Sequence, residues 1–379
     1  MKRIFVWAVG MCAVCGTVSA QLTLEECYRA ARENYPLVRQ FDLIERTKDF
    51  TVENAAKGYF PQLSFSGKAS YQSDVTKMPF SIPGVEFGLD NDQYQLVLEL
   101  NQTVWDGGVV RNRKEEARAK SEVQKGQLEV NLYALNDRVN QLFFGMLLID
   151  AQLAQNALLQ AQLARNHGQV SACMQQGVAN QADLDAVKVE QLNTKQKRVE
   201  LASSRMAYLK MLSLLVGEKL SQETVLEKPV PQDDISAVGE IRRPELSLFN
   251  AQGVGLQVQE KALNVRHLPQ FGLFVQGAYG NPGLNMLKNE FSPYYIAGVR
   301  LSWNFGSLYT LKNDRKVIEN KRRQLDNNRD VFLFNTRLEM TQQDQAIQSL
   351  EKQMQDDDEI IRLRTNIRNR QRPKWRMEH

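Results

Sequence analysis

Four stretches of the chain alternate apolar and polar residues with the two-residue period of a β-strand that has two different faces. The first two lie within 61–105, where the second reads YQLVLELNQTVW, and the other two lie within 269–305. The segments that separate the members of each pair, 73–92 and 281–293, are rich in Pro, Gly and Asn. The pattern therefore predicts two β-hairpins.

The two hairpins belong to an internal repeat. Pro36 and Pro61 have the same spacing as Pro244 and Pro269, and each second proline is followed by Gln and an alternating run. The repeat predicts the following organisation: a first repeat at 21–217 (a helix, the hairpin 61–105 and a long helical hairpin at 110–216), a linker at 218–243, and a second repeat at 244–370 (a helix, the hairpin 269–305 and a long helix).

The long helix expected after the first hairpin carries a narrow apolar stripe. No proline occurs between residues 110 and 169, and apolar residues recur in steps of four and three, which is typical of a coiled coil. The stripe consists of Leu128, Leu132, Leu135, Val139, Leu142, Met146, Ile149 and Leu153. Such a stripe suits contact with other helices. No apolar run beyond residue 20 approaches eighteen residues, so we expect no transmembrane helix.

Three interpretations of the apolar strand faces are open. The strands form a soluble sheet packed on helices, a transmembrane β-barrel with its apolar face toward lipid, or short β elements of a coiled-coil stalk. The narrow stripe leaves no second apolar face for a soluble sheet, and a stalk does not explain two copies of a hairpin. A barrel fits the strand lengths and the aromatic residues near strand ends, which suit membrane interfaces: Tyr71, Tyr94, Trp105, Tyr279, Tyr294, Tyr295 and Trp303.

Four strands cannot close a barrel, and an open sheet edge in lipid would leave backbone groups without hydrogen bonds. The barrel interpretation therefore requires an oligomer. Two copies would give eight strands and a filled interior, whereas three copies would give twelve strands and a wider interior. A conduit function favours three copies.

The composition adds an export signal and excludes some classes. Residues 1–20 have a basic start, an apolar run and small residues before Gln21, which predicts a cleaved signal peptide. The formal net charge of +4 comes from interspersed charges, so we expect no nucleic-acid partner. The mature chain keeps two cysteines, Cys27 and Cys173. We expect two free thiols, although a single disulfide remains an alternative.

No constellation of residues indicates catalysis. His167, His267 and His379 are far apart, and the sequence contains no phosphate-binding glycine loop and no nucleophile motif. The segment Asp106-Gly107-Gly108 is typical of a turn that ends a strand and opens a helix. We therefore expect no enzyme activity, no cofactor and no metal site.

Several motifs taken in order resemble the TolC-type outer membrane efflux proteins. They are LTLEECYRAARENYPLV near the mature start, GYFPQLSFSG and LNQTVWDGG at strand borders, and the repeated unit of strand, loop, strand and long helix. The resemblance covers residues 22 to about 370. It implies an α+β membrane protein: each subunit would give four strands to a trimeric twelve-stranded outer membrane β-barrel, and long coiled-coil-like helices would form a periplasmic α-barrel.

The same resemblance implies a function and partners. The chain would be a homotrimeric channel in the outer membrane, in contact with outer membrane lipid and extending into the periplasm. It would act as the passive conduit of a tripartite efflux system, in which a periplasmic adaptor protein connects it to an inner membrane pump. The substrate is not encoded in these motifs. An extracytoplasmic coiled-coil protein with a structural or adhesive role is the alternative.

Two sets of residues are candidates for functional sites. Lys68, Glu99 and Arg300 lie at polar positions of the strands, where they would line the lumen and select solutes by charge or serve only solvation. The segment MQQGVANQADL resembles the family's periplasmic tip, which implies that Gly177, Asp183 and Leu184 contact the adaptor. The alternative is an ordinary interhelical turn in which Asp183 is a helix cap.

The end of the sequence departs from the repeat. The spacing from Gly107 to Gly177, added to Gly306, places a second tip near residue 376, so a returning helix is expected beyond the residues present. Residues 371–379, which include Pro373 and several basic residues, do not resemble a helix. We hypothesise a truncation or a frameshift, in which case the chain would be an incomplete and non-functional efflux protein.

Overall fold

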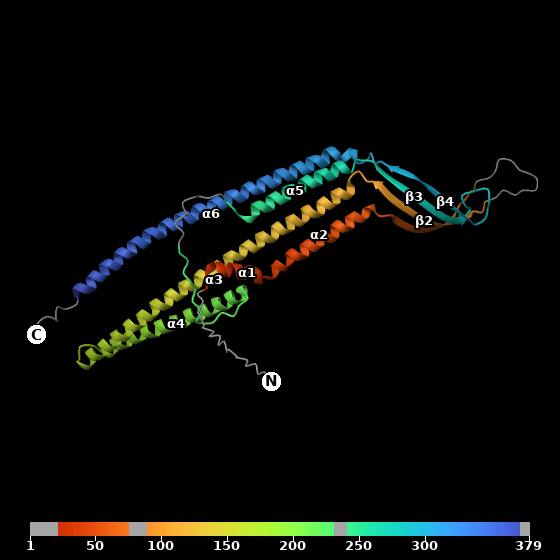
Figure 1. Cartoon of the computed structure of the whole chain (residues 1–379). Helices are drawn as coiled ribbons and strands as arrows, with labels where there is room; N and C mark the ends of the chain where they lie inside the picture. The colour runs from red at the N-terminus through yellow and green to blue at the C-terminus, as the bar shows by residue number, and fades with distance from the viewer. Residues whose placement is uncertain (1–21, 76–88, 231–240, 372–379) are drawn as a thin grey trace, which may run out of the picture. The chain divides into compact units, whose positions relative to one another are not determined.

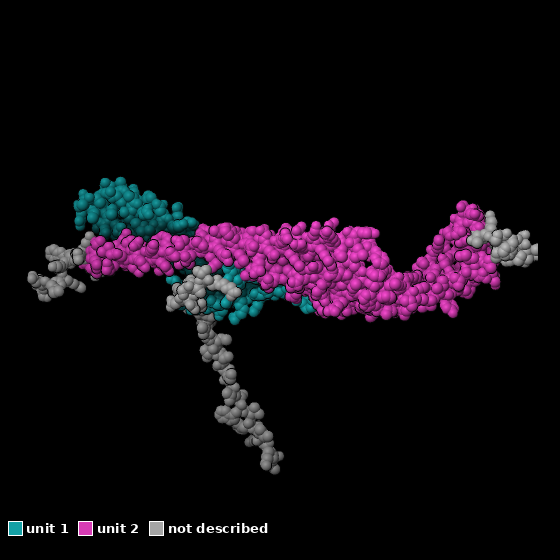
Figure 2. All heavy atoms as spheres, turned by 90° about the horizontal axis from the view of Figure 1, so that it is seen from above, with its two compact units in different colours: residues 1–48, 124–245 teal, residues 49–123, 246–379 magenta. Residues whose placement is uncertain are grey.

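The computed structural model describes residues 22–75, 89–230 and 241–371. The expected signal peptide, most of the first hairpin loop and the unusual tail from residue 372 lie outside these ranges. The chain divides into two compact units, formed by residues 1–48 with 124–245 and by residues 49–123 with 246–379 (Figure 2). The second unit combines segments of both repeats, because the strands of the two repeats form one sheet.

The first unit is helical. It contains α1 (Leu24–Asn34), a 3₁₀ turn (Pro36–Arg39), the start of α2 (Gln40–Ala56), most of α3 (Val109–Gln175) and α4 (Gln181–Val216). Helix α1 begins with a capping box. The amide of Glu26 donates to Thr23 Oγ1 at 3.2 Å, and the amide of Thr23 donates to Glu26 Oε2 at 3.0 Å. This reciprocal arrangement satisfies two backbone donors at the start of the helix.

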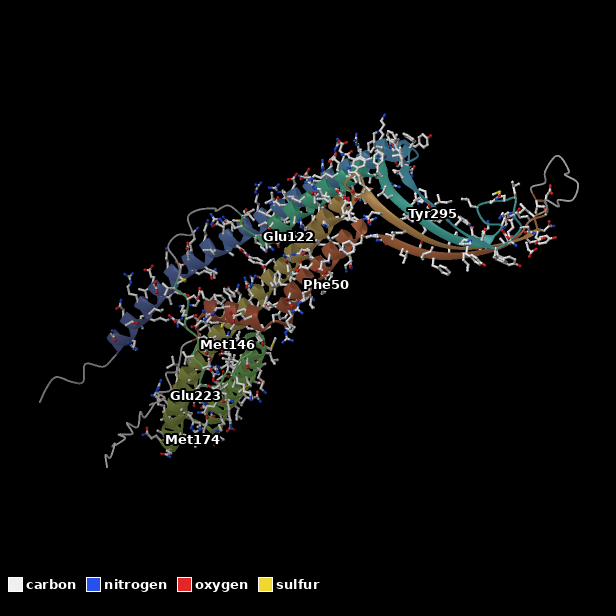
Figure 3. The ribbon with its side chains drawn as sticks, turned by 45° about the vertical axis from the view of Figure 1, so that its right-hand side comes forward. Phe50, Glu122, Met146, Met174, Glu223 and Tyr295 are labelled. Atoms are coloured by element: carbon white, nitrogen blue, oxygen red, sulfur yellow. The ribbon has the colours of Figure 1, made fainter. Side chains whose placement is uncertain are left out.

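The apolar stripe of α3 forms the core of this unit, as predicted. Every member from Leu128 to Ile149 is less than a tenth exposed, and Leu153 is half-buried. The core cluster joins residues of α3, α1 and α4, including Phe143, Cys27 and Leu212, each with no exposed area. Figure 3 shows Met146 midway along α3 and Met174 at its turn end, with α4 running back beside it.

The next step of the stripe is polar. Asn156 is 8% exposed, and its Nδ2 donates to the backbone oxygen of Thr194 on α4 at 3.1 Å. Gln160 Nε2 donates to Asn156 Oδ1 at 3.0 Å. A buried asparagine in a coiled-coil seam fixes the register of the two helices at some cost in stability. Asn156 therefore sets the alignment of α3 against α4.

Helix α3 also contains an 18-residue window that is long and apolar enough to cross a membrane by length and composition alone. The expectation of no transmembrane helix was based on continuous apolar runs, and this window, which qualifies by length and composition only, does not test that expectation. The window tolerates isolated polar residues, which our search for continuous apolar runs did not. Only 28% of the window is buried in the structure, because apolar side chains such as Leu148 and Leu158 lie outside the seam and are exposed.

The second unit contains the four predicted strands in one antiparallel sheet (Figure 1). The strands are β1 (Gln62–Tyr71), β2 (Asp92–Trp105), β3 (Gln270–Asn281) and β4 (Ser292–Ser302), in the order β1-β2-β3-β4. The two hairpins pair with each other through β2 and β3, with Glu99 opposite Gln276. The register of β2 shifts between Thr103 and Trp105, near the end of the strand.

Helices extend from the strand ends of this unit. They are the end of α2, a 3₁₀ turn (Lys57–Tyr59), the start of α3, α5 (Pro244–Val265) and α6 (Leu308–Gln371). Helix α5 lies antiparallel to the first part of α6, as three contacts show: Arg315 donates to Asn264 at 2.8 Å, Arg322 pairs with Glu260 at 2.6 Å, and the rings of Phe249 and Phe332 are 5.9 Å apart. Residues 341–364 of α6 are all exposed.

Candidate functional site

The sheet is amphipathic in an unusual sense, because its apolar face is the more exposed one. Along β2 and β3 the apolar residues are exposed, whereas the residues between them are half-buried or buried. The pairing register places the apolar residues of all four strands on one face. They include Leu63, Phe65, Leu96, Leu98, Leu100, Leu273, Val275, Val299 and Leu301, each at least 38% exposed. An apolar surface of this extent indicates contact with a membrane or another protein.

Aromatic residues mark both ends of this apolar face. At one end the ring of Phe291 stacks on Tyr94 and Tyr279, with centroids 6.2 Å and 5.6 Å away. At the other end Trp105 lies 5.8 Å from Phe271. Tyr94 and Trp105 are eleven positions apart on β2. At about 3.4 Å per residue and a tilt of about 40°, this spacing gives an apolar band of about 28 Å, close to the height of outer membrane barrels.

The prediction for Tyr294 was wrong. Tyr294 pairs with Ala278, which places it on the polar face, and its hydroxyl accepts a hydrogen bond from Gln95 Nε2. Its neighbour Tyr295 is 79% exposed on the apolar face (Figure 3). Two consecutive tyrosines necessarily occupy opposite faces of a strand, so only one of them suits a membrane interface.

The polar face carries a pair of opposite charges. Arg300 of β4 pairs with Glu99 of β2 at 3.0 Å and donates to Asn101 Oδ1 at 3.2 Å, and its guanidinium lies 4.8 Å from the ring of Phe274. Gly298 lies opposite Phe274, and a Cβ atom there would be 3.0 Å from the ring. The glycine therefore makes room for the aromatic ring, and the ring supports the guanidinium through a cation–π contact.

Of the three predicted lumen residues, the structure brings Glu99 and Arg300 together and leaves Lys68 apart. All three lie on the polar face, since Lys68 is opposite Gln95 and Glu99 is opposite Ser64. Lys68 is exposed, and within the described ranges it makes no ion pair. The sequence did not indicate the contributions of Asn101 and Phe274, because these contacts depend on the register between strands.

The turn from β2 into α3 is held by one carboxylate. Asp106 is 5% exposed, and its Oδ1 accepts from Tyr59 Oη at 2.7 Å and from the Gly108 amide at 2.9 Å. Its Oδ2 accepts from the Val110 amide at 2.6 Å. Burial raises the pKa of Asp106, but these hydrogen bonds to the ionised form outweigh it and lower the pKa below its ordinary value. Gly107 has φ +69°, which a side chain would strain.

The second repeat uses a neutral residue at the corresponding place. Asn304 Oδ1 accepts from the Gly306 amide at 2.9 Å, as Asp106 accepts from Gly108. Ser307 Oγ donates to the backbone oxygen of Asn304 at 2.9 Å. The same two-residue turn therefore connects a strand to a long helix in both repeats.

The predicted tip is a tight turn at residues 176–180 between α3 and α4. The segment GQVSACMQQGVANQAD, which begins at Gly168, predicts a break before a second helical run at about 182–216, but helix α3 continues past Gly168 to Gln175, so the break is shorter than predicted. Gly177 has φ +75° and is exposed, and a Cβ there would contact nothing within 4 Å. Val178 next to it is 77% exposed.

The assignment of the helix cap to Asp183 was wrong in detail. Asn180 is the N-cap of α4, and its Oδ1 accepts from the Asp183 amide at 3.0 Å. Asp183 returns the interaction, because its Oδ2 accepts from the Asn180 amide at 2.9 Å. Leu184 is half-buried. The structure thus explains Asp183 as the partner in a capping box, and leaves Gly177 and Val178 as exposed residues of the tip.

Comparisons with solved structures find the same fold in outer membrane channels. The OprN outer membrane channel matches with a TM-score of 0.57 and 14% identity, over 82% of this chain and 71% of that chain. The CmeC outer membrane channel of Campylobacter jejuni matches with a TM-score of 0.56 and 12% identity, over 82% and 68%. VceC, an outer membrane protein of Vibrio cholerae, matches with a TM-score of 0.56 and 11% identity, over 80% and 73%.

Comparisons of sequence point to the same group. No curated protein matches this chain. The model of the outer membrane efflux protein family matches residues 27–218, which is half of the chain and most of the first repeat. Together with the amphipathic sheet and the long helices, this match confirms the resemblance found in the sequence: the chain belongs to the outer membrane efflux protein family.

Proposed function

We propose that this chain is a subunit of a homotrimeric outer membrane channel, the passive conduit of a tripartite efflux system. In this proposal, three copies contribute twelve strands to a barrel in the outer membrane, and the helices extend into the periplasm. A periplasmic adaptor protein joins the channel to an inner membrane pump that drives transport. Family membership and the fold of the matching channels support the proposal.

The observation that carries the proposal is the exposed apolar face of a sheet with two free edges. Strands β1 and β4 each pair on one side only within the described sheet. Free edges next to lipid would leave backbone donors and acceptors without partners. Pairing of β1 of one copy with β4 of the next satisfies these groups, and a ring of copies closes the sheet.

Membrane fractionation and gel migration test this assembly. The mature chain should partition with the outer membrane and migrate as a trimer before heating and as a monomer after heating. An extracytoplasmic coiled-coil protein, the alternative function, would instead be recovered in the soluble fraction as a species that heating does not change. Recovery of a water-soluble monomer would refute the channel.

The charges on the polar face give a sharper test of a lumen. Glu99 and Arg300 neutralise each other, so Lys68 is expected to dominate the field that a permeating ion meets. In planar bilayers under a KCl gradient, we expect Lys68→Gln to shift the reversal potential toward cations. Arg300→Gln should shift the reversal potential in the same direction, because it leaves Glu99 unpaired. The double variant Glu99→Gln/Arg300→Gln should shift the reversal potential least. Lys210→Gln, on the exposed surface of α4, is the matched control.

The tip is the proposed contact with the adaptor. Because φ at Gly177 disfavours a side chain, Val178→Cys in a Cys173→Ser background is the better position for a crosslinker. We expect an adduct with a periplasmic adaptor from Val178→Cys and none from Gly168→Cys, an exposed site away from the turn. Leu184→Ala should reduce the yield of this adduct if Leu184 shares the docking surface. Equal yields at positions 178 and 168 would remove the tip from the proposal.

A further inference from the structure

The helices next to the sheet follow the order of the strands. Tyr59, just after α2, donates to Asp106, just before α3, at 2.7 Å. Lys261 of α5 pairs with Glu115 of α3 at 3.3 Å, and α5 lies against α6 as described above. Among the described elements of this unit, α2 and α6 are therefore the two edge helices, as β1 and β4 are the two edge strands (Figure 1).

One side of α6 carries no charge over its first thirty residues. Of the 33 residues in 308–340, 13 are charged, yet none of these occupies a series of nine exposed positions spaced three or four residues apart. At 3.6 residues per turn, this series lies on the side of α6 opposite Arg322, which pairs with Glu260 of α5. We call the series the α6 stripe: Tyr309, Asn313, Val317, Asn320, Gln324, Asn327, Val331, Phe334 and Leu338.

Helix α2 has a matching uncharged side. Six of its 17 residues are charged, but none of them belongs to the exposed series Leu43, Thr47, Phe50 and Asn54, the α2 stripe. The spacing of four, three and four residues places this stripe on the side of α2 opposite Glu45, which pairs with Lys125 of α3 at 2.6 Å. Phe50 is 63% exposed and lies near the middle of the helix (Figure 3).

The absence of charge distinguishes these stripes from ordinary helix surface that faces water. Charged residues are depleted, and aromatic residues are enriched, in the central part of contacts between proteins. The spacing of three and four residues is that of helices that pack side by side. Both stripes are exposed in the single chain, so the surface that covers them comes from outside the chain.

We propose that the α6 stripe of one copy packs against the α2 stripe of the next copy. The proposal rests on the ring of copies described under the proposed function, because pairing of β4 with β1 of the next copy brings together the helices attached to these strands. Helix α6 follows β4, and α2 precedes β1. The contact between two sheets thus continues as a contact between two helices, and the partner is a second copy of this chain.

The distances along the chain align the two stripes. Helix α2 ends six residues before β1 begins, and α6 begins six residues after β4 ends. Phe50 is twelve residues before the first residue of β1, and position 314 is twelve residues after the last residue of β4. The two helices run in opposite directions relative to the sheet. Phe50 of one copy should therefore insert between Asn313 and Val317 of its neighbour, as a knob enters a hole.

A pair of cysteines tests this contact. In a Cys173→Ser background, Phe50→Cys/Val317→Cys should give covalent dimers and trimers when outer membranes are treated with a short bismaleimide and then heated in detergent. Phe50→Cys/Arg315→Cys is the matched control. Arg315 is close to Val317 in the chain but is directed to α5, where it donates to Asn264, so this pair should remain monomeric.

The crosslinked products also identify the partner. A link within one chain would appear as a monomer of altered mobility and would overturn the assignment to a second copy. Equal amounts of covalent oligomer from the control pair would overturn the assignment to these two stripes. A wild type that forms trimers while the Phe50→Cys/Val317→Cys pair gives no oligomer would overturn this inference and leave the channel intact. A wild type that forms no trimer would overturn both.

A pair of opposite charges gives an independent measurement. Phe50→Glu and Val317→Lys each place a charge in an uncharged contact, so each should lower the temperature at which the trimer dissociates in gels. The double variant should regain part of this loss, because the two charges meet across the interface. Circular dichroism checks that each variant is folded. Losses that simply add in the double variant would show that the two side chains do not meet, and would overturn the proposed alignment.

Discussion

Replacement of Asp106 by alanine should destabilise the junction between β2 and α3. The substitution removes both amide hydrogen bonds at the start of the helix and the partner of the Tyr59 hydroxyl. Loss of an N-terminal cap costs about 0.5–2 kcal/mol, and a side-chain hydrogen bond contributes about 0.5–1.5 kcal/mol. The free energy of unfolding should therefore fall by about 1–3 kcal/mol.

Asp106→Asn should have a smaller effect. Asn304 shows that an asparagine in this turn still accepts from the amide two residues later. The variant keeps the bond to Gly108 but has one acceptor oxygen instead of two, so it loses the bond to Val110. We expect about half the loss of Asp106→Ala. Urea titration followed by fluorescence, with Trp105 adjacent to the substituted residue, measures both variants.

The pH dependence of the free energy of unfolding provides a second test, in which wild type is compared with Asp106→Asn. The pKa of Asp106 is lower in the folded chain than in the unfolded chain, so its contribution is present above the unfolded pKa of about 3.9 and is lost as the pH falls through the folded value. Asp106→Asn does not titrate. The difference in stability between wild type and Asp106→Asn should therefore shrink below about pH 4. Two results would refute the reasoning: an Asp106→Ala variant as stable as wild type at pH 7, or a difference in stability between wild type and Asp106→Asn that does not change as the pH is lowered.

Three further predictions concern other parts of the molecule. Asn156→Leu should raise the melting temperature of the α3–α4 hairpin, since an apolar residue suits the seam better; a lower melting temperature would contradict the role assigned to Asn156. Maleimide should label the exposed Cys173 in the folded chain but Cys27 only after unfolding, because Cys27 has no exposed area and burial raises its pKa to about 11; rapid double labelling of folded protein would exclude this. Gly298→Val should displace the ring of Phe274 and destabilise the sheet by about 1–3 kcal/mol, which heat-dependent gel migration of the assembled protein measures, and Phe274→Leu in the same chain should restore part of the loss.

Periodicity predicted the faces of the strands because each face meets a different environment along its whole length. Leu63 and Phe65 are on the apolar face for the same reason as Leu273 and Val275. Phe274 broke the pattern, and a single strand gives no reason for this. The reason lies in two neighbouring strands: Gly298 leaves the space, and Arg300 covers the ring.

The sequence could not predict how strands that are distant in the chain pair with each other, and the reason is physical. Glu99 and Arg300 meet only because β2 pairs with β3 and β3 pairs with β4, each in one particular register. A shift of one residue in either pairing would move a charge to the apolar face. The repeat predicted that two hairpins exist, but the way in which they join comes from the packing of the whole sheet.

The predicted end of α3 was wrong for a different reason, because a single glycine was taken as a helix break. Gly168 indicated a break, yet the helix continues to Gln175. A glycine inside a helix costs only about 1 kcal/mol. Leu163 is buried a few residues earlier, and Gln191 of α4 donates to its backbone oxygen at 3.2 Å. Helix α3 is therefore packed on α4 shortly before the glycine, and the small cost of one glycine does not end it there.

Average hydropathy and periodicity lead to opposite conclusions about where this chain meets lipid, and the structure explains why. The window that qualifies as a membrane span belongs to α3, a helix whose seam from Leu128 to Ile149 is buried within the first unit. In the strands that we propose contact lipid, every second residue is polar or small, so their average hydropathy is modest. A lipid-facing sheet needs apolar residues only on one side. Alternation therefore detects the surface that an average conceals, and the exposed Leu96, Leu98 and Leu100 on one face of β2 are the residues that it detects.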